Sequence, residues 1–206
     1  MPRKADEHLE GRILDAAYRL WRKGGEEAVT MRAVARAAGT TTPTLYERFR
    51  DKHDLLELLQ ERARQKVFLS IKDARSASEA CRRALKFMVA HGNEYRLLIA
   101  NWAARMARKE HMPSYEFLTV LLARDLGGSP KTYAKLAMAL VALIYGAAAL
   151  LVEGEIEKKI SREFREACLT ACDALIDSAR NKAARPAKQH HAQRMAIDTA
   201  RQVAGG

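Results

Sequence analysis

The stretch that decides the fold is residues 30–56, TMRAVARAAGTTTPTLYERFRDKHDLL. Thr30 can cap a first helix, and Gly39 suits the position just past the end of that helix, where a positive φ is cheap only without a Cβ. Thr41 offers a second N-cap, and Pro43 is acceptable behind it because a first helical turn has no intrahelical N–H bonds to lose. The pattern predicts two short helices joined by a glycine turn, with a third helix directly behind them. A helix-turn-helix of this size is suited to presenting a polar helix to the major groove of DNA.

The second short helix is expected to face DNA. Thr42 and Thr44 lie in its first turn, which is the part of a recognition helix that reaches base edges. Tyr46 and Lys52, with Thr30 at the preceding cap, are better placed for phosphates. The full set of expected DNA-binding residues is Thr30, Arg32, Thr40, Thr41, Thr42, Pro43, Thr44, Tyr46, Arg48 and Lys52.

This segment resembles the TetR family of transcriptional repressors. The family pattern runs Gly, small apolar, Ser or Thr, any residue, a small residue or Pro, Thr or Ser, Leu or Ile, Tyr, two variable residues and Phe, then a capped helix with an early Lys. The matching positions are Gly39, Thr41, Pro43, Thr44, Leu45, Tyr46, Phe49, Asp51, Lys52 and Leu55, preceded by Ile13, Leu14, Ala17, Leu20 and Trp21 with Gly24 and Gly25 after them. The sequence departs at Thr40, where Val or Ala is usual, and at His53, where Glu is common. The motif covers roughly the first 60 residues, and the rest of the chain matches the family only in length and helicity.

The composition favours an all-helical protein with a polyanionic partner. Only 5 of the 206 residues are proline, and β-branched alternation is scarce. The 36 basic and 25 acidic side chains give a net charge of +11. This excess is not concentrated in the motif, because residues 1–54 carry 11 basic and 9 acidic side chains. Contacts to phosphates therefore have to come from a few well-placed groups.

The expected architecture is all-α, with an N-terminal three-helix head and a larger helical domain. The head is a helix-turn-helix DNA-binding domain over residues 1–50, a ligand-binding and dimerisation domain covers 51–181, and a basic tail of doubtful order covers 182–206. Ser129 is expected to cap a long helix opened by Pro130, and Pro186 to separate the tail. The helices expected after the head are 52–74, one from residue 78, one on the apolar stripe 98–106, a shorter one around 118–122, 131–152 and 162–179.

Two of these helices invite a partner. Residues 131–152 are apolar nearly all round and rich in small side chains, and residues 162–179 carry an apolar seam. An ordinary intrachain core would explain both, but the resemblance implies that they pair with their symmetry copies in a homodimer. Dimerisation also follows from recognition, because two half-sites of a palindromic operator roughly add their binding free energies. Residues 136–152 contain no charge, yet we expect a buried interface helix there rather than a membrane span.

The middle helices are expected to form a chamber for a small-molecule effector. Any single aromatic or Met on a helical stripe is more often plain core, so the group is a safer prediction than its members. Asn101 and Arg105 flank Trp102 and could meet an anionic or polar ligand group, although a solvated face explains them equally well. The expected effector is apolar or amphipathic, and aromatic or cationic. The expected lining residues are Phe68, Phe87, Met88, Tyr95, Leu98, Trp102, Met106, Tyr115, Phe117 and Tyr145.

The sequence provides little for catalysis or metal binding. Cys168 and Cys172, spaced i, i+4, could hold a soft metal or sense oxidants, but small buried cysteines are the better interpretation. His190 and His191 would need a further ligand for tight metal binding. The sequence contains no Gly-rich phosphate loop, nucleophile elbow, HExxH or CxxC motif. We therefore expect no catalytic residues, no metal, no cofactor and no enzyme activity.

Together these observations predict a homodimeric DNA-binding regulator that a small molecule releases from its operator. Repression is the favoured sign of regulation. An odd number of cysteines and an N-terminus without an apolar segment favour the cytoplasm and no membrane association. Two alternatives stay open: a ligand-independent architectural DNA-binding protein, and a small helical enzyme with a fortuitous helix-turn-helix.

Overall fold

The computed structural model describes residues 8–100, 102–108, 110–154 and 157–204, without the side chains of Ala103 and of residues 185–204. All regular secondary structure in these ranges is helical, which confirms the all-α prediction. The chain divides into two compact units, one formed by residues 1–66 with 91–110 and the other by residues 67–90 with 111–206.

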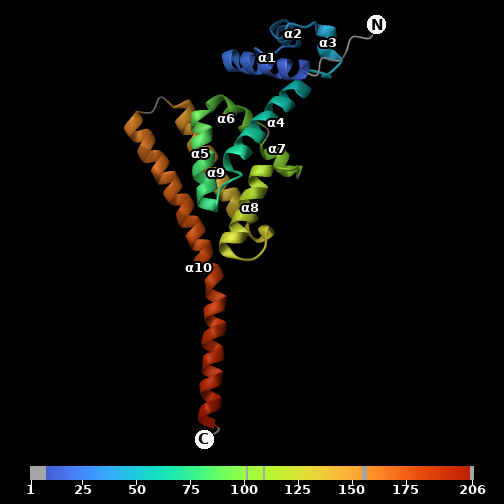
Figure 1. Cartoon of the computed structure of the whole chain (residues 1–206). Helices are drawn as coiled ribbons and strands as arrows, with labels where there is room; N and C mark the ends of the chain where they lie inside the picture. Colours follow the sequence, from blue (N-terminus) through green and yellow to red (C-terminus); the bar gives the residue numbers. More distant parts are fainter. Residues whose placement is uncertain (1–7, 101, 109, 155–156, 205–206) are drawn as a thin grey trace. The chain divides into compact units, whose positions relative to one another are not determined.

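The first unit begins with three helices around a small core. Five large apolar side chains of these helices and of the segment behind them are at most 1 % exposed: Ile13, Val34, Leu45, Phe49 and Leu55. Each such side chain stabilises the fold by about 1.5–3 kcal/mol. Helix α2 packs against both α1 and α3 (Figure 1). The helices of this unit are α1 (Leu9–Gly24), α2 (Met31–Ala38), α3 (Thr42–Tyr46), the first part of α4 (Lys52–Ile71), α6 (Gly92–Ile99) and α7 (Trp102–Ala107).

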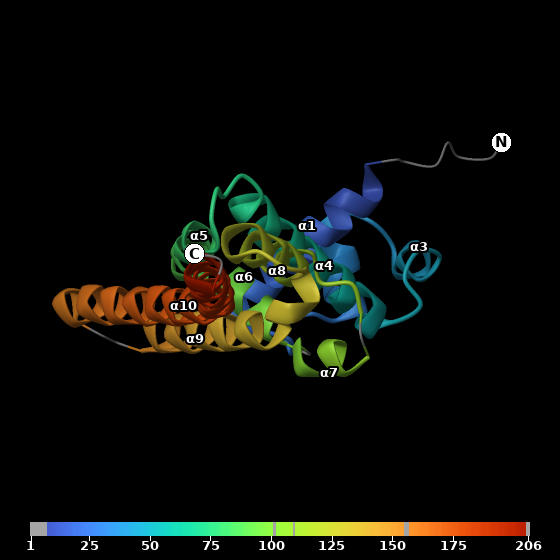
Figure 2. The same cartoon turned by 90° about the horizontal axis from the view of Figure 1, so that it is seen from below.

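The second unit is a helical bundle built around α9. Helix α9 packs against α5, α8 and α10, and Figure 2 shows α9 and α10 lying side by side. Its core includes Leu85, Met88, Leu121 and Leu140, each at most 2 % exposed. Besides the end of α4, its elements are α5 (Ala77–Ala90), α8 (Pro113–Leu126), the 3-10 helix η1 (Pro130–Tyr133), α9 (Ala134–Glu153) and α10 (Lys158–Ala204).

The structure corrects several expected helix boundaries. The stripe 98–106 is not one helix, because α6 ends at Ile99 and Ala100, with φ −59° and ψ 127°, leaves the helical region. Neither glycine nor proline marks this break, so tertiary packing decides it. Helix α4 ends at Ile71 rather than near residue 74.

The two prolines expected to bound helices behave differently from the prediction. Pro130 opens a 3-10 turn before α9, and the Ser129 hydroxyl bonds the Thr132 hydroxyl at 3.2 Å instead of capping the backbone. Helix α10 continues past Pro186 to Ala204, so that proline does not end the helix. A proline inside a helix removes one backbone donor, and a long helix can tolerate that loss.

One segment, Pro130–Glu153, is long and apolar enough to cross a membrane by length and composition alone. Its most apolar window has a mean hydropathy of 2.2, and only 28 % of that window is buried within the chain. The core helix of a soluble protein can show the same composition. The low burial is the more informative property, because it leaves much apolar surface uncovered on α9.

Candidate nucleic-acid interface and ligand region

The turn between α2 and α3 has the geometry that the glycine predicts. Gly39 lies in the left-handed region, with φ 67° and ψ 38°. Its N–H donates to the carbonyl of Arg36 at 3.3 Å, and the N–H of Thr40 donates to the carbonyl of Ala35 at 3.0 Å. This pair of bonds satisfies the last carbonyls of α2 and turns the chain sharply towards α3.

Two threonines start the helices on either side of this turn. The Thr30 hydroxyl accepts the N–H of Ala33 at 3.2 Å, and the Thr41 hydroxyl accepts the N–H of Thr44 at 3.3 Å. Both predicted N-caps are therefore confirmed. The Thr41 and Thr44 hydroxyls also bond each other at 2.9 Å, which fixes the first turn of α3. The helix presents its polar side chains while Leu45 is fully buried beneath them.

All ten expected DNA-binding residues retain accessible surface. Half-buried members lie next to the exposed ones on α3 and at the start of α4. The exposed members are Thr30, Arg32, Thr41, Pro43 and Tyr46, and the half-buried ones are Thr40, Thr42, Thr44, Arg48 and Lys52.

The two cations at the end of this surface have partners within the head. Arg48 Nη1 donates to the Thr44 carbonyl at 3.4 Å and lies 3.8 Å from the Glu47 carboxylate. Lys52 Nζ lies 3.7 Å from the Glu26 carboxylate, and the two side chains are 38 % and 62 % exposed. Ion pairs this exposed are weak, so a phosphate can replace the carboxylate at small cost.

The start of α4 is fixed by two aspartates. The Asp51 carboxylate accepts the N–H of Asp54 at 2.9 Å, and the Asp54 carboxylate accepts the N–H of Arg50 at 3.2 Å. The hydrogen bonds from the backbone and guanidinium of Arg50 lower the pKa of Asp54 below its ordinary value. These bonds set where α4 begins behind the recognition helix.

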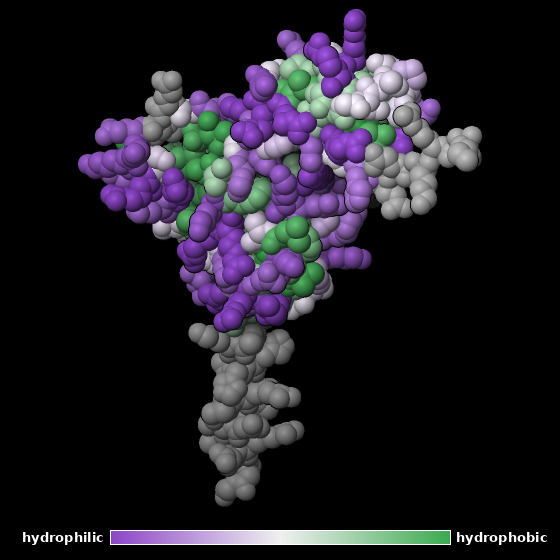
Figure 3. Space-filling view, turned by 45° about the horizontal axis from the view of Figure 1, so that its top comes forward, coloured by the Kyte–Doolittle hydropathy of each residue, from purple (hydrophilic) through white to green (hydrophobic). Residues whose placement is uncertain are grey.

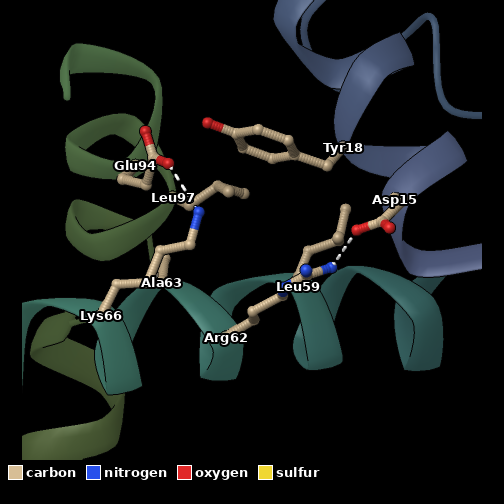
Figure 4. A pocket seen from close by; sticks show the side chains of 8 residues that line it. All are labelled: Asp15, Tyr18, Leu59, Arg62, Ala63, Lys66, Glu94 and Leu97. Atoms are coloured by element: carbon tan, nitrogen blue, oxygen red, sulfur yellow. Dashed lines mark hydrogen bonds and ion pairs between the residues drawn. The ribbon is translucent and has the colours of Figure 1, made fainter. Parts of the chain in front are cut away.

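A pocket of about 220 Å³, with several charged side chains in its wall, lies among α1, α4 and α6 in the first unit (Figure 4). In Figure 4 the side chain of Glu94 on α6 points towards Lys66 on α4 and the Tyr18 hydroxyl on α1. Lys66 Nζ donates to Glu94 at 2.8 Å and also lies 5.0 Å from the centre of the Tyr18 ring. The pocket is lined by Asp15, Tyr18, Leu59, Arg62, Ala63, Lys66, Glu94 and Leu97, and includes none of the expected ligand-binding residues.

Two titratable side chains of this pocket, Glu94 and Tyr18, have shifted pKa values. The Glu94 side chain is only 8 % exposed, and burial alone would raise the pKa of this carboxyl group. Hydrogen bonds from Lys66 and Tyr18 outweigh burial, so the Glu94 pKa lies below its ordinary value. Burial and the Glu94 carboxylate raise the pKa of Tyr18. This cluster could not be predicted from the sequence, because no spacing rule relates side chains from three separate helices.

The expected ligand-binding residues are divided between the two units. Tyr95, Leu98 and Met88 are at most 3 % exposed, as core residues are, whereas the others are half-buried. Phe68 and Phe117 meet edge to face with ring centres 6.0 Å apart. Asn101 lies outside the described residues. The first unit contains Tyr95, Leu98, Trp102 and Met106, and the second contains Phe68, Phe87, Met88, Tyr115, Phe117 and Tyr145.

The three cysteines are buried in the second unit. The thiol of Cys172 on α10 interacts with those of Cys81 on α5 and of Cys168 one turn earlier, and the Cys168 thiol donates to the Leu143 carbonyl at 3.6 Å. Burial raises the pKa of Cys168 to about 11, and the Cys81 bond and burial raise that of Cys172. Among the described residues, no group of three or more His, Cys, Asp or Glu side chains is arranged to hold a metal ion. Buried thiols of high pKa are poor nucleophiles, so the interpretation as small core side chains fits this cluster.

Comparison with known proteins gives a family for the head and a fold for the chain. Residues 13–59 match the family model of bacterial regulatory proteins, tetR family. No curated protein matches the chain. Among solved structures, a TetR-family transcriptional regulator from Streptomyces coelicolor is similar with 22 % identity and a TM-score of 0.60, over 83 % of this chain and 99 % of that one.

Two further structures show the same likeness. A TetR-like transcriptional regulator from Rhodococcus sp. RHA1 has 24 % identity and a TM-score of 0.54, over 85 % of this chain and 96 % of that one. A TetR variant from Acinetobacter baumannii AYE, solved in complex with minocycline, has 17 % identity and a TM-score of 0.61, over 87 % and 99 %. The chain therefore carries the N-terminal helix-turn-helix domain of the TetR family of bacterial regulatory proteins, and it folds as the transcriptional regulators of that family do.

Proposed function

We propose that this chain is a homodimeric, sequence-specific DNA-binding repressor that a small molecule releases from a palindromic operator. The observation that carries the proposal is the Gly39 turn followed by the Thr41-capped helix, which leaves Thr42 and Thr44 accessible in its first turn. The proposed division of labour is a DNA-binding domain over 1–50, a ligand-binding and dimerisation domain over 51–181, and a basic tail beyond it. A cytoplasmic location goes with this function.

The proposal of a dimer is supported by apolar surface on α9 and α10 that the chain itself leaves uncovered. Ala139, Ala142 and Gly146 on α9 are exposed, and a Cβ added to Gly146 would have no neighbouring atom within 4 Å. Figure 3 shows apolar patches within the mostly hydrophilic surface of the face in view. Small residues in a row allow two helices to approach closely, and the larger side chains beside them supply apolar area. The large exposed apolar side chains of the two helices are Met138, Leu150, Ile160, Phe164 and Leu175.

The proposed effector acts by preferring a conformation that DNA does not. A ligand shifts such an equilibrium only by its difference in affinity for the two conformations. The Acinetobacter relative was solved with minocycline, which supports a small-molecule site in this fold without identifying the effector here.

DNA binding is tested by substitutions in the head, measured by fluorescence anisotropy on promoter fragments at several salt concentrations. Thr42→Ala is expected to relax base preference, because a base-edge contact is lost. Lys52→Ala is expected to weaken binding to all sequences alike and to reduce the salt slope by about one. Lys131→Ala, an exposed lysine on η1, serves as the matched control and leaves both quantities unchanged. Unchanged binding in both head variants would refute the assignment of the interface.

Assembly is tested by sedimentation. Ala142→Arg places a charge on the exposed small-residue face of α9 and is expected to give a folded monomer, because an unpaired charge in an apolar interface is strongly unfavourable. Gln65→Arg, at an exposed position on α4, is the control and leaves the dimer intact. A wild-type protein that is monomeric at micromolar concentration would contradict the proposal.

A further inference from the structure

The first unit contains a group of three arginines on α4, on α7 and just after α7. Arg64 on α4 and Arg105 on α7 are largely buried, with side chains 11 % and 15 % exposed, and Arg108 follows α7 with 58 % exposure. The guanidinium of Arg64 pairs with Glu61 at 2.9 Å. Arg105 and Arg108 both pair with one carboxylate, that of Glu110, at 2.9 and 2.6 Å.

The charges of this arginine cluster (Arg64, Arg105, Arg108, Glu61 and Glu110) do not balance. Three guanidinium groups face two carboxylates, which leaves one positive charge in excess. All three arginines act on Glu110: the hydrogen bond from Arg108 and the charges of Arg105, Arg108 and Arg64 lower its pKa despite some desolvation. The charge of Arg64 thus acts on Glu110, while its own guanidinium is paired with Glu61.

Two buried donors of the cluster have no acceptor within the described part of the chain. These are Nη1 of Arg64 and Nε of Arg105. A buried donor without a partner destabilises a protein by about 1–3 kcal/mol, and by more when it is charged. Such groups are retained where something else accepts the hydrogen bond, and a guanidinium fork matches the two oxygens of a carboxylate.

The side chains beside Arg105 suggest the rest of such a molecule. Trp102 lies three residues before Arg105, so the two side chains are neighbours on α7, and Met106 lies one turn after Trp102. Both side chains are half-buried. An arginine next to a tryptophan and a methionine suits a ligand with one acidic end and an apolar body.

We infer that the effector is an amphipathic organic acid whose carboxylate takes the place of Glu110 on Arg105 and accepts the orphaned Nη1 of Arg64. This inference rests on the proposed function, because it names the chemical class of the proposed effector. It also reverses part of the expectation from the sequence, which favoured an aromatic or cationic molecule. Glu110 then acts as an internal carboxylate that holds Arg105 and Arg108 until the effector arrives.

The test compares three probes of equal chain length: octanoate, octan-1-ol and octylammonium. Binding to the wild-type protein is measured by calorimetry, with tryptophan emission as a second readout. Octanoate is expected to bind at least tenfold more tightly than octanol, and octylammonium more weakly than octanol. Equal or tighter binding of either of the other two probes, or no binding of octanoate at millimolar concentration, would overturn the inference.

Substitutions distinguish binding of octanoate at the arginine cluster from nonspecific binding elsewhere on the protein. Arg105→Met is expected to abolish the preference for octanoate, and Glu110→Gln to strengthen octanoate binding several-fold because the competing charge is gone. Arg82→Met is the matched control, since Arg82 pairs with Asp173 in the second unit and is 53 % exposed. If Arg105→Met does not fold, the Glu110→Gln result decides: unchanged or weaker octanoate binding refutes the inference.

DNA affinity is measured separately on the same samples. A protein that prefers octanoate but keeps its DNA affinity supports the acid site and contradicts the proposed release mechanism. If the protein binds no promoter DNA in any condition, the proposed function as a DNA-binding regulator is contradicted. The relative affinities of the three probes still test the acid site at the arginine cluster.

Discussion

The ion pair between Lys66 and Glu94 is the sharpest test of how the first unit is held together. Replacing Lys66 with Met leaves the Glu94 carboxylate with the Tyr18 hydroxyl but without its cation. Breaking a fully buried pair in this way destabilises a protein by about 3–5 kcal/mol, whereas exposed pairs contribute about 0–1 kcal/mol. Glu94 is 8 % exposed and Lys66 is 41 % exposed, so the pair lies between these limits. We expect Lys66→Met to lower the free energy of unfolding by about 2 kcal/mol at neutral pH.

The reverse substitution is expected to be milder. Glu94→Gln leaves Lys66 without its partner, but a lysine that is 41 % exposed can turn its ammonium group to water. The expected loss is about 1 kcal/mol. The double variant should be more stable than the sum of the two single losses implies, because its buried amide needs no cation. Arg62→Met, which breaks an ion pair with Asp15 whose partners are 43 % and 52 % exposed, is the control with a loss below about 1 kcal/mol.

The free energy of unfolding is measured by urea denaturation, with circular dichroism as the signal. In a thermal melt, a loss of 2 kcal/mol corresponds to a fall in Tm of about 4–8 °C for a chain of this size. The pH dependence of this stability difference is a second check, and its direction follows from the pKa of Glu94. The pKa of Glu94 is lowered in the folded protein, so its contribution is present above the ordinary pKa of a glutamate and lost as pH falls through the lower folded value. The difference between wild type and Lys66→Met should therefore shrink below about pH 4. A Lys66→Met protein as stable as wild type at neutral pH, or less affected than Glu94→Gln, would refute the reasoning.

Three further predictions concern the turn, the cap and the thiols. Gly39→Ala should destabilise the head by about 1 kcal/mol in a thermal melt, because Gly39 has φ 67° and an alanine there is strained even with open space around the Cβ. Gly11→Ala on α1 is the control and should be neutral or stabilising in the same melt. Thr41→Ala should lower stability by about 1 kcal/mol through loss of the N-cap and should weaken DNA binding further, while Thr41→Ser should restore both, as chemical denaturation and anisotropy would show. Cys168 and Cys172 should react with a thiol reagent at pH 8 only after unfolding, because they are buried and their pKa values are raised; rapid labelling of the native protein would contradict this.

The head could be predicted from the sequence because its rules are local. A threonine at the start of a helix is read as an N-cap that accepts the backbone N–H three residues later. A glycine just past the end of a helix is read as a left-handed turn. The structure confirms the roles of Thr30, Gly39 and Thr41. The buried positions Leu45 and Phe49 follow from the same short helix and its turn.

What the sequence could not show depends on contacts between distant residues. The break at Ala100 has no glycine or proline to announce it, and the Lys66–Glu94 pair joins residues 28 positions apart. The orphaned donors of Arg64 and Arg105 become visible only when burial is known. The aromatic set suggested from composition mixed core side chains such as Tyr95 with half-buried ones such as Trp102, because periodicity reports a face and not its depth.

The bonds at Glu94 have a mechanical consequence for the first unit. Helices that meet through apolar side chains can slide, because their contact area declines gradually as they move apart. A hydrogen bond to a buried carboxylate weakens steeply with distance and angle, so the 2.8 Å bond from Lys66 on α4 to Glu94 on α6 is either formed or broken. The attachment of α6 to α4 at this point therefore opens and closes in one step. A displacement of α6 along α4 would break this bond abruptly, before the apolar contacts around it are lost.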